Sequence, residues 1–245
     1  DWYMDEAARH KVLVTLVIGQ KTPRWPECHV PAWAQALDAP GYATALKQYL
    51  VDVVERYKKH PALEYWQVEN EANPKFGTCP HFVQSLVPSE FDLVREHDPF
   101  HARLSTDSGE LSLWRSSAHA GELFGTTLYR TVWAPYVGYI RYDYLIPAAW
   151  YRLRAFLNHI SPETALVVEL QAEPWIPSGS VVTTPLDEQA RSMSAKRLVE
   201  NVRFAQRIGF PRIYLWGVEW WYYLSDIKGG KSVLSAAEAI FSKKE

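Results

Sequence analysis

Cysteine is scarce in this chain, and long hydrophobic runs are missing from it. Cys28 and Cys79 are its two cysteines among 245 residues, too few for a disulfide framework in a chain of this size. The longest strongly apolar runs, such as residues 12–19, are less than half as long as a membrane span, so no membrane is expected as a partner. The first six residues are acidic and lack the apolar segment of a signal peptide. This favours the cytoplasm but leaves export open, because we expect the chain to begin within a structural unit.

An excess of charge of either sign is also missing. The chain has 26 Lys and Arg against 28 Asp and Glu, a net charge of −2 that gives no electrostatic reason to expect nucleic acid. A glycine-rich phosphate loop is missing too, since residues 19–26 (GQKTPRWP) fit neither G-x-G-x-x-G nor a P-loop. Aromatic side chains, in contrast, are abundant: 11 Trp, 14 Tyr and 9 Phe. Trp and Tyr combine flat apolar faces with a polar tip, which suits a core and also suits stacking against sugars.

Short apolar runs alternate with amphipathic stretches along the chain. Several runs are continuously apolar, as expected of parallel strands buried on both faces; the runs cover residues 12–18, 63–68, 103–106, 124–129, 165–168 and 212–216. Helical spacing covers residues 46–57 and 146–160, and a longer helix is predicted from Asp187 to Gly209, with Gly209-Phe210-Pro211 as its stop signal. Six strand–helix repeats without a linker predict one α/β domain over residues 1–245. A (β/α)8 TIM-type barrel fits better than a nucleotide-binding open sheet, which would need a glycine-rich turn after its first strand.

Two clusters of carboxylates lie where predicted strands end. Glu69, Asn70 and Glu71 follow one strand, and Glu169 and Glu173 lie at the end of a later one. Active sites of TIM barrels are built at the carboxyl ends of the strands. Two glutamates about 5–5.5 Å apart there suit a retaining glycosidase, one as acid/base and the other as nucleophile. The alternative is that these side chains cap helices or pair with arginines on loops.

These residues make the chain resemble the clan A glycoside hydrolases, retaining barrel enzymes that include family 5 cellulases and family 35 and 42 β-galactosidases. Asn70-Glu71 matches the Asn-Glu pair that ends the fourth strand of that clan, which implies that Glu71 is the acid/base. Glu169, followed by Gln171, matches the nucleophile near the end of the seventh strand. The stretch from Pro23 to Glu27, which contains Trp25, is similar to the loop after the third strand.

A set of substrate-binding residues is expected around these two glutamates. Asn70 is expected to bind the sugar 2-hydroxyl, a contact that strengthens in the transition state. Tyr129 is expected to donate a hydrogen bond to the nucleophile and keep it ionised, or else to be a tyrosine at the edge of the core. Trp216 ends the last strand, where the clan places a stacking platform. The remaining candidates for the cleft are Trp25, Glu173 (also a rival nucleophile), Glu219, Trp220 and Trp221.

The sequence departs from the clan because its visible strands correspond to the third to the eighth. Residues 1–10 look like the end of the helix before strand three, so we expect either a fragment or a shortened, incomplete barrel. Strand number, tilt and shear are linked in a barrel, so six units would leave an open side between residues 12–18 and 212–216. Bare strand edges invite pairing. We therefore expect a homo-oligomer that covers this side, or else internal filling by residues 133–144.

The two cysteines leave three alternatives. Cys28-His29 and the pair Cys79 and His81 lie on loops after neighbouring strands, so they could bind zinc, form a disulfide or remain two cysteines without a partner. The spacing is not a recognised zinc pattern. The unpaired state is the leading expectation.

The function predicted from these residues is hydrolysis of β-glycosidic bonds with retention, by an exo-acting enzyme such as a β-galactosidase or β-glucosidase. The alternatives are an endo-β-glucanase or mannanase of the same clan, and a non-catalytic carbohydrate-binding relic. An unrelated phosphate-binding barrel is disfavoured because Trp216-Gly-Val-Glu-Trp220 stands where its glycine-rich loop would be. The predicted mechanism needs no metal or organic cofactor. The partner is a carbohydrate whose identity the sequence does not fix.

Overall fold

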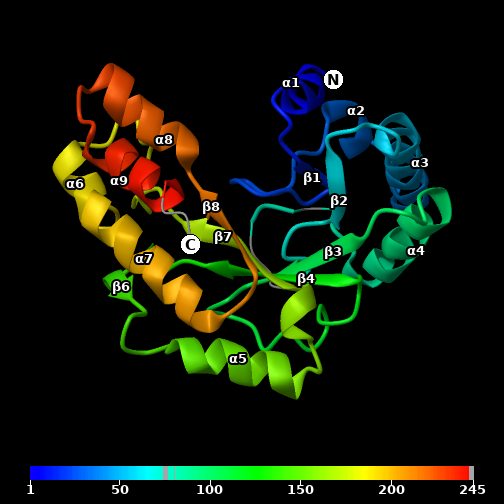
Figure 1. Cartoon of the computed structure of the whole chain (residues 1–245). Helices are drawn as coiled ribbons and strands as arrows, with labels where there is room; N and C mark the ends of the chain where they lie inside the picture. The colour runs from blue at the N-terminus through cyan, green and yellow to red at the C-terminus, as the bar shows by residue number, and fades with distance from the viewer. Residues whose placement is uncertain (74–76, 80, 243–245) are drawn as a thin grey trace. The chain divides into compact units, whose positions relative to one another are not determined.

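A computed structural model of the chain describes residues 1–73, 77–79 and 81–242 (Figure 1). The strands are β1 (Val14–Ile18), β2 (Leu63–Val68), β3 (Arg103–Asp107), β4 (Leu123–Leu128), β5 (Thr131–Ala134), β6 (Gly138–Arg141), β7 (Ala165–Gln171) and β8 (Arg212–Trp216). The helices are α1 (Trp2–Arg9), α2 (Ala32–Gln35), α3 (Ala39–Tyr57), α4 (Val87–His97), α5 (Ala148–Leu157), α6 (Leu186–Ala190), α7 (Ala195–Ile208), α8 (Val218–Tyr222) and α9 (Ser232–Phe241). Short 3₁₀ or π turns cover Gln84–Leu86, Pro162–Thr164 and Tyr223–Ile227.

The sheet confirms the α/β fold class predicted from the sequence. Its strand order is β1-β2-β3-β4-β7-β8, and the six strands are the six predicted from the apolar runs. Strands β1 and β2, β2 and β3, and β7 and β8 pair in parallel. The bounds of β2 and β8 are those predicted, and the other four differ by a few residues at their ends. Strands β5 and β6, which form a separate antiparallel hairpin, were not predicted.

The chain divides into two compact units of almost equal size. The first comprises residues 1–108 and 112–125, and the second comprises residues 109–111 and 126–245. In the first unit α3 packs against α4, and α4 packs on β2 and β3 (Figure 1). Its core is a cluster of buried apolar side chains centred on β2 and these two helices. Trp66 is wholly buried there, and its indole N–H donates to Asp98 Oδ2 at 2.8 Å, which satisfies its one polar atom.

The second unit is built around β7 and β8. Helix α7 packs against β7, and α5 and α9 pack against α7 (Figure 1). Helix α7 begins at Ser194, whose Oγ accepts the Arg197 backbone N–H at 3.2 Å, and ends before Gly209 in the left-handed conformation. Both are common helix-end signals, and Gly209 is the predicted stop.

The single helix predicted from Asp187 to Gly209 is wrong. The segment forms two helices, α6 and α7, separated by residues 191–194. Ser194 is fully extended, with φ −156° and ψ 169°, so its side chain caps a new helix instead of continuing the old one. No helix among the described residues is long and apolar enough to span a membrane.

The leading expectation for the cysteines is also wrong. Cys28 and Cys79 form a disulfide with Cα atoms 5.1 Å apart, and no free cysteine is found in the described residues. The two positions are 51 residues apart in the sequence, but they follow β1 and β2, which are neighbouring parallel strands. The carboxyl ends of such strands lie side by side, which brings the two loops together.

Candidate active site

The first glutamate cluster directly follows β2, as predicted. Glu69 and Glu71 both have left-handed backbone conformations, with φ 59° and 41°, so the chain turns sharply where the strand ends. Non-glycine residues rarely adopt this conformation, and it persists only where the surroundings hold it. The Glu71 backbone N–H donates to Thr106 Oγ1 of β3 at 2.9 Å, and its carbonyl accepts from Lys21 Nζ at 2.7 Å. The N–H and the carbonyl of Glu71 are therefore both held by residues of the first unit.

The Asn70 carboxamide is held by three side chains. Its Oδ1 accepts from Gln67 Nε2 at 3.0 Å and from Thr106 Oγ1 at 3.4 Å, while its Nδ2 donates to Glu27 Oε2 at 3.2 Å. Asn70 and Glu27 are both buried, and burial raises the pKa of the Glu27 carboxyl above its ordinary value. The network fixes which end of the amide is the donor. A role for Asn70 was predicted from the sequence, but the Glu27 carboxylate was not predicted as its partner.

Glu69 turns into the interior instead of towards Asn70. Its carboxylate accepts the backbone N–H groups of Gln20 at 2.7 Å and Lys21 at 2.5 Å. Gly19, at φ +119°, lies so close that an added Cβ would meet Glu69 Oε1 at 2.2 Å, so only glycine fits there. Burial raises the pKa of Glu69 well above its ordinary value, with a further contribution from the neighbouring Glu90. Glu69 therefore serves the packing of the strand end.

Glu90 of α4 shares a hydrogen bond with Glu69, and burial raises its pKa to about 7. A carboxyl whose pKa is raised on folding stabilises the folded state below its unfolded pKa, and this stability is lost as the pH rises through about 7. We expect the unfolding free energy to fall between about pH 4.5 and pH 7, by on the order of 3 kcal/mol for such a shift. Glu90→Gln, which stays neutral and can still accept the hydrogen bond from Glu69 through its amide oxygen, is expected to flatten this slope and to stabilise the protein at pH 8. Urea unfolding across pH 4.5–8 measures how the unfolding free energy changes with pH. Glu96→Gln, at an exposed position of α4, is the control, and equal slopes for the wild type and Glu90→Gln would contradict the prediction.

The second cluster lies at the end of β7. Glu169 is buried in this strand, and its Oε2 accepts the Tyr129 hydroxyl at 2.6 Å. The expected hydrogen bond from Tyr129 is thereby confirmed. A hydroxyl donated to a carboxylate stabilises its ionised form, which a nucleophile needs. The Trp175 ring meets the Tyr129 ring edge to face, with centroids 5.4 Å apart, and limits the positions the tyrosine can take.

The backbone of Tyr129 contacts a buried ionic cluster. Its backbone N–H donates to Glu110 Oε2 at 3.3 Å, and Glu110 also accepts the Tyr151 hydroxyl at 2.8 Å. Arg130 Nη1 lies 3.6 Å from Glu110 Oε1. Burial nevertheless raises the pKa of Glu110 to about 7.

Gln171 appeared in the sequence analysis only as part of a motif. Its side chain accepts the Thr131 N–H at 2.9 Å and donates to the Thr131 C=O at 2.7 Å, as the backbone of a neighbouring strand would.

The remaining predicted residues lie in different surroundings. Glu173 Oε1 accepts the Trp216 indole N–H at 3.1 Å, and an added Cβ on Gly217 would come within 2.3 Å of the Glu173 Cβ. Trp221 is buried and donates to the Ala172 carbonyl at 2.8 Å, whereas Glu219 is exposed on α8. Trp25 is 65% exposed in the first unit. The substrate-binding roles of these five residues, Trp25, Glu173, Trp216, Glu219 and Trp221, stay predictions.

The structure thus brings together Asn70 with Glu27, Tyr129 with Glu169, and Glu173 with Trp216. Glu71 belongs to the first unit and Glu169 to the second. No group of three or more possible metal ligands occurs among the described residues. Sequence reasoning missed Lys21, Glu27, Glu90 and Glu110 as site neighbours. The signal for Lys21 and Glu27 was their position in the segment after β1, because β1 pairs with β2 and Glu71 follows β2.

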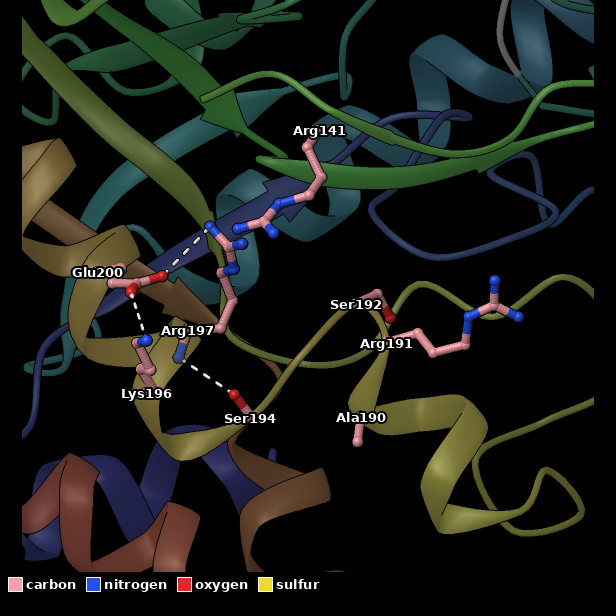
Figure 2. Close-up of a pocket in the computed structure, with 8 residues that line it drawn as sticks. All are labelled: Arg141, Ala190, Arg191, Ser192, Ser194, Lys196, Arg197 and Glu200. Carbon is pink, nitrogen blue, oxygen red and sulfur yellow. Dashed lines mark hydrogen bonds and ion pairs between the residues drawn. The ribbon is translucent and has the colours of Figure 1, made fainter. Parts of the chain in front are cut away.

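A separate cavity of about 210 Å³ lies in the second unit (Figure 2). Its lining is rich in cations: Arg141, Ala190, Arg191, Ser192, Ser194, Lys196, Arg197 and Glu200. The cations have carboxylate partners, since Asp143 pairs with Arg141 and Arg197, Glu188 with Arg191, and Glu200 with Lys196. The lining includes none of the predicted site residues. Because each of these cations is already paired with a carboxylate, this cavity carries no argument for a particular ligand.

Comparisons with known proteins find no matching family model and no curated protein that matches the sequence. Among solved structures, the chain has the fold of barrel glycoside hydrolases. It is similar to xylanase 10B of Thermotoga petrophila in complex with xylobiose (TM-score 0.57, 17% identity, 97% of this chain and 76% of that one). Native xylanase 10B of Thermotoga maritima is similar as well (TM-score 0.56, 14% identity, 99% and 79%).

A third similar structure is β-glucuronidase 2 of Bacteroides uniformis, covalently bound to cyclophellitol-6-carboxylate aziridine (TM-score 0.54, 14% identity, 89% of this chain). The chain spans about a quarter of the length of this and other β-glucuronidases that it matches. These structures are glycoside hydrolases, as the sequence resemblance implied. At this level of identity the likeness is one of fold, and the resemblance to families 5, 35 and 42 in particular stays a prediction.

Proposed function

We propose that this chain carries the active site of a retaining β-glycoside hydrolase, with Glu169 as nucleophile and Glu71 as acid/base. The observation that supports this most is the buried Glu169 carboxylate at the end of β7, which accepts the Tyr129 hydroxyl at 2.6 Å. A hydroxyl donated to this carboxylate favours its ionised form, which a nucleophile needs. The Asn70-Glu71 pair at the end of β2 supplies the second carboxyl that double displacement requires.

The proposed reaction has two steps. In the first, a Glu169 oxygen attacks the anomeric carbon, the bond from that carbon to the glycosidic oxygen breaks, and Glu71 gives its proton to the leaving oxygen. In the second, the ionised Glu71 takes a proton from water, the water oxygen attacks the anomeric carbon, and the ester bond to Glu169 breaks. Two inversions give net retention. Asn70 is proposed to bind the 2-hydroxyl, and Trp216 to stack beneath the sugar ring.

The finer proposal is exo cleavage of a β-galactoside or β-glucoside. The test is a panel of 4-nitrophenyl β-galactoside, glucoside, xyloside and glucuronide, with xylan as the polymeric substrate, because similar structures are named as xylanases and β-glucuronidases. We expect release of nitrophenol from the galactoside or glucoside, with the β-anomer of the sugar appearing first in the NMR spectrum. Initial formation of the α-anomer would exclude double displacement. Sugar binding without turnover of any panel member would favour the non-catalytic relic.

A homo-oligomer is also proposed, as the sequence predicted. Strands β1 and β8 stand at the two ends of the strand order. Their side chains are mostly half-buried, whereas those of β3 are all buried. Terminal strands of this kind are what a second copy would cover.

A further inference from the structure

Lys21 is a buried lysine at the strand end that carries Glu71. It is 1% exposed, and each of its polar groups makes a contact with the Glu69–Glu71 segment. Its backbone N–H donates to Glu69 Oε2 at 2.5 Å, its carbonyl accepts the Asn70 N–H at 2.7 Å, and its Nζ donates to the Glu71 carbonyl at 2.7 Å. The Lys21 side chain thus holds Glu71, and the Lys21 backbone holds the two residues before it, Glu69 and Asn70.

The ammonium group is surrounded by carboxylates. Glu71, Glu27, Glu69 and Asp107 all act on it, and Glu90 lies beyond Glu69. Burial lowers the pKa of Lys21, while these carboxylates oppose the shift, Glu71 most of all. A buried ammonium ion is costly unless anions compensate it. A neutral side chain would fill the same space without that cost, so the charge itself calls for an explanation.

We propose that Lys21 is a positioning residue for Glu71, holding its main chain in place and setting the pH at which its carboxyl loses its proton. This inference rests on the proposed function, in which Glu71 is the acid/base. Nothing in the sequence resemblance assigned a role to Lys21.

The geometric part of the role follows from the backbone. Glu71 has φ 41°, a conformation that a side-chain-bearing residue adopts only at an energetic cost. Thr106 holds its N–H and Lys21 holds its C=O, so the two contacts bracket the strained residue. Releasing one contact lets the peptide rotate and moves the carboxyl. Displacements of this kind reduce catalysis strongly, because proton transfer depends on the position of the acid.

The electrostatic part of the role follows from the opposite charges of Lys21 and Glu71. Since the Glu71 carboxylate favours the charged form of Lys21, the Lys21 ammonium favours the ionised form of Glu71 to the same extent. Removing the positive charge therefore moves the Glu71 titration to higher pH. In a retaining glycosidase the basic limb of the pH profile of kcat/KM reports the acid/base, so this limb should move with it.

The test compares Lys21→Met, Lys21→Gln and Lys21→Arg in the full chain. Met removes both the charge and the contact, Gln keeps an N–H donor without the charge, and Arg keeps the charge. We expect the basic limb to rise by about one pH unit in the Met and Gln variants and to stay in place in the Arg variant. We expect kcat/KM to fall by about 10- to 100-fold in Lys21→Met, most for substrates with poor leaving groups.

Lys58→Met is the matched control. Lys58 Nζ also donates to a backbone carbonyl, that of His97 at 3.1 Å, in the same unit but away from the strand end. This variant should leave the pH profile and kcat/KM unchanged. A loss of structure alone would lower activity without moving the basic limb of the pH profile.

A second readout needs no turnover. The Glu71 carboxyl carbon, assigned by its absence in Glu71→Gln, is titrated by carbon-13 NMR in the wild type and the Lys21 variants. We expect a rise of about one pH unit in Lys21→Met and Lys21→Gln. If the wild type hydrolyses no glycoside, the proposed function fails, while this titration still decides on the coupling. If Lys21→Met does not fold, the comparison of Lys21→Gln with Lys21→Arg decides instead. Unchanged titration and an unchanged basic limb in the uncharged variants would overturn the inference.

Discussion

Replacing Glu169 by alanine is expected to abolish hydrolysis, and adding azide is expected to restore it in part. The carboxylate lies buried at the end of β7 and accepts the Tyr129 hydroxyl at 2.6 Å, so alanine removes the proposed nucleophile and leaves a small space facing that hydroxyl. Loss of a covalent nucleophile lowers kcat by roughly 10⁵-fold or more in enzymes of this type of chemistry. Azide is small enough to enter and attack the anomeric carbon directly. One displacement replaces two, so the product is the inverted glycosyl azide.

Glu71→Ala is expected to behave differently, because Glu71 is proposed to give and take a proton without forming a bond to the sugar. Turnover of substrates with poor leaving groups should fall by about 10²- to 10⁴-fold. Substrates with good leaving groups, which need little help from an acid, should still form the glycosyl ester. Azide then attacks that ester, so the rescued product keeps the original configuration. NMR of the two azide products separates the roles.

Glu173→Ala is the control for the nucleophile. Glu173 lies two residues beyond β7 and accepts the Trp216 indole at 3.1 Å, so its loss should weaken substrate binding and leave double displacement intact. Inverted azide product from Glu173→Ala, together with activity in Glu169→Ala, would reverse the assignment.

The strands and the two glutamate clusters could be predicted because their signals are local. Continuous apolar runs identify strands buried on both faces, and the bounds of β2 and β8 agree with the structure. Once a strand is located, its carboxyl end is known: Glu71 follows β2 as predicted, and Glu169 lies two residues before the end of β7. The hydrogen bond from Tyr129 to Glu169 was predictable through the family resemblance, which supplied the pairing of two strand ends.

The surroundings of these residues could not be predicted, because they depend on contacts between distant parts of the chain. Lys21 and Glu27 look like loop residues in the sequence, yet both are buried beside Asn70 and Glu71. Glu90 occupies a helix, where a carboxylate normally faces water, but it is directed at Glu69. Polar residues buried in pairs have no periodic signal, since each is compatible with burial only when its partner is present.

The break between α6 and α7 has a different cause. Apolar spacing continues from Asp187 to Gly209, so the pattern predicts one helix, but Ser194 offers its hydroxyl to the Arg197 N–H. A serine inside a helical pattern can lie on an exposed face or begin a new helix, and the choice depends on the buried Ser192 and Met193 before it. The Ser192 hydroxyl donates to the Trp175 carbonyl at 2.9 Å, a tertiary contact that the pattern cannot contain.

The disulfide gives the largest expected effect on stability. Cys28 and Cys79 are separated by 51 residues, and a bridge closing a loop of that length restricts the unfolded chain by about 4 kcal/mol in the loop-entropy account. Reduction is therefore expected to lower the unfolding free energy by about this amount and the melting temperature by about 10 °C. Guanidinium unfolding with and without dithiothreitol measures the change, and Ellman's reagent counts the thiols.

Reduction is also expected to disturb the candidate site. The disulfide begins at Cys28, one residue after Glu27, and the Glu27 carboxylate accepts a hydrogen bond from Asn70 Nδ2 at 3.2 Å. A loosened loop at residue 28 releases Glu27 and with it the orientation of the Asn70 amide. We therefore expect KM to rise on reduction at temperatures well below melting. Cys28→Ser/Cys79→Ser is the control: it should match the reduced wild type in stability and should not respond to dithiothreitol. Two free thiols in the untreated native protein, or equal unfolding midpoints for the oxidised and the fully reduced chain, would contradict this prediction.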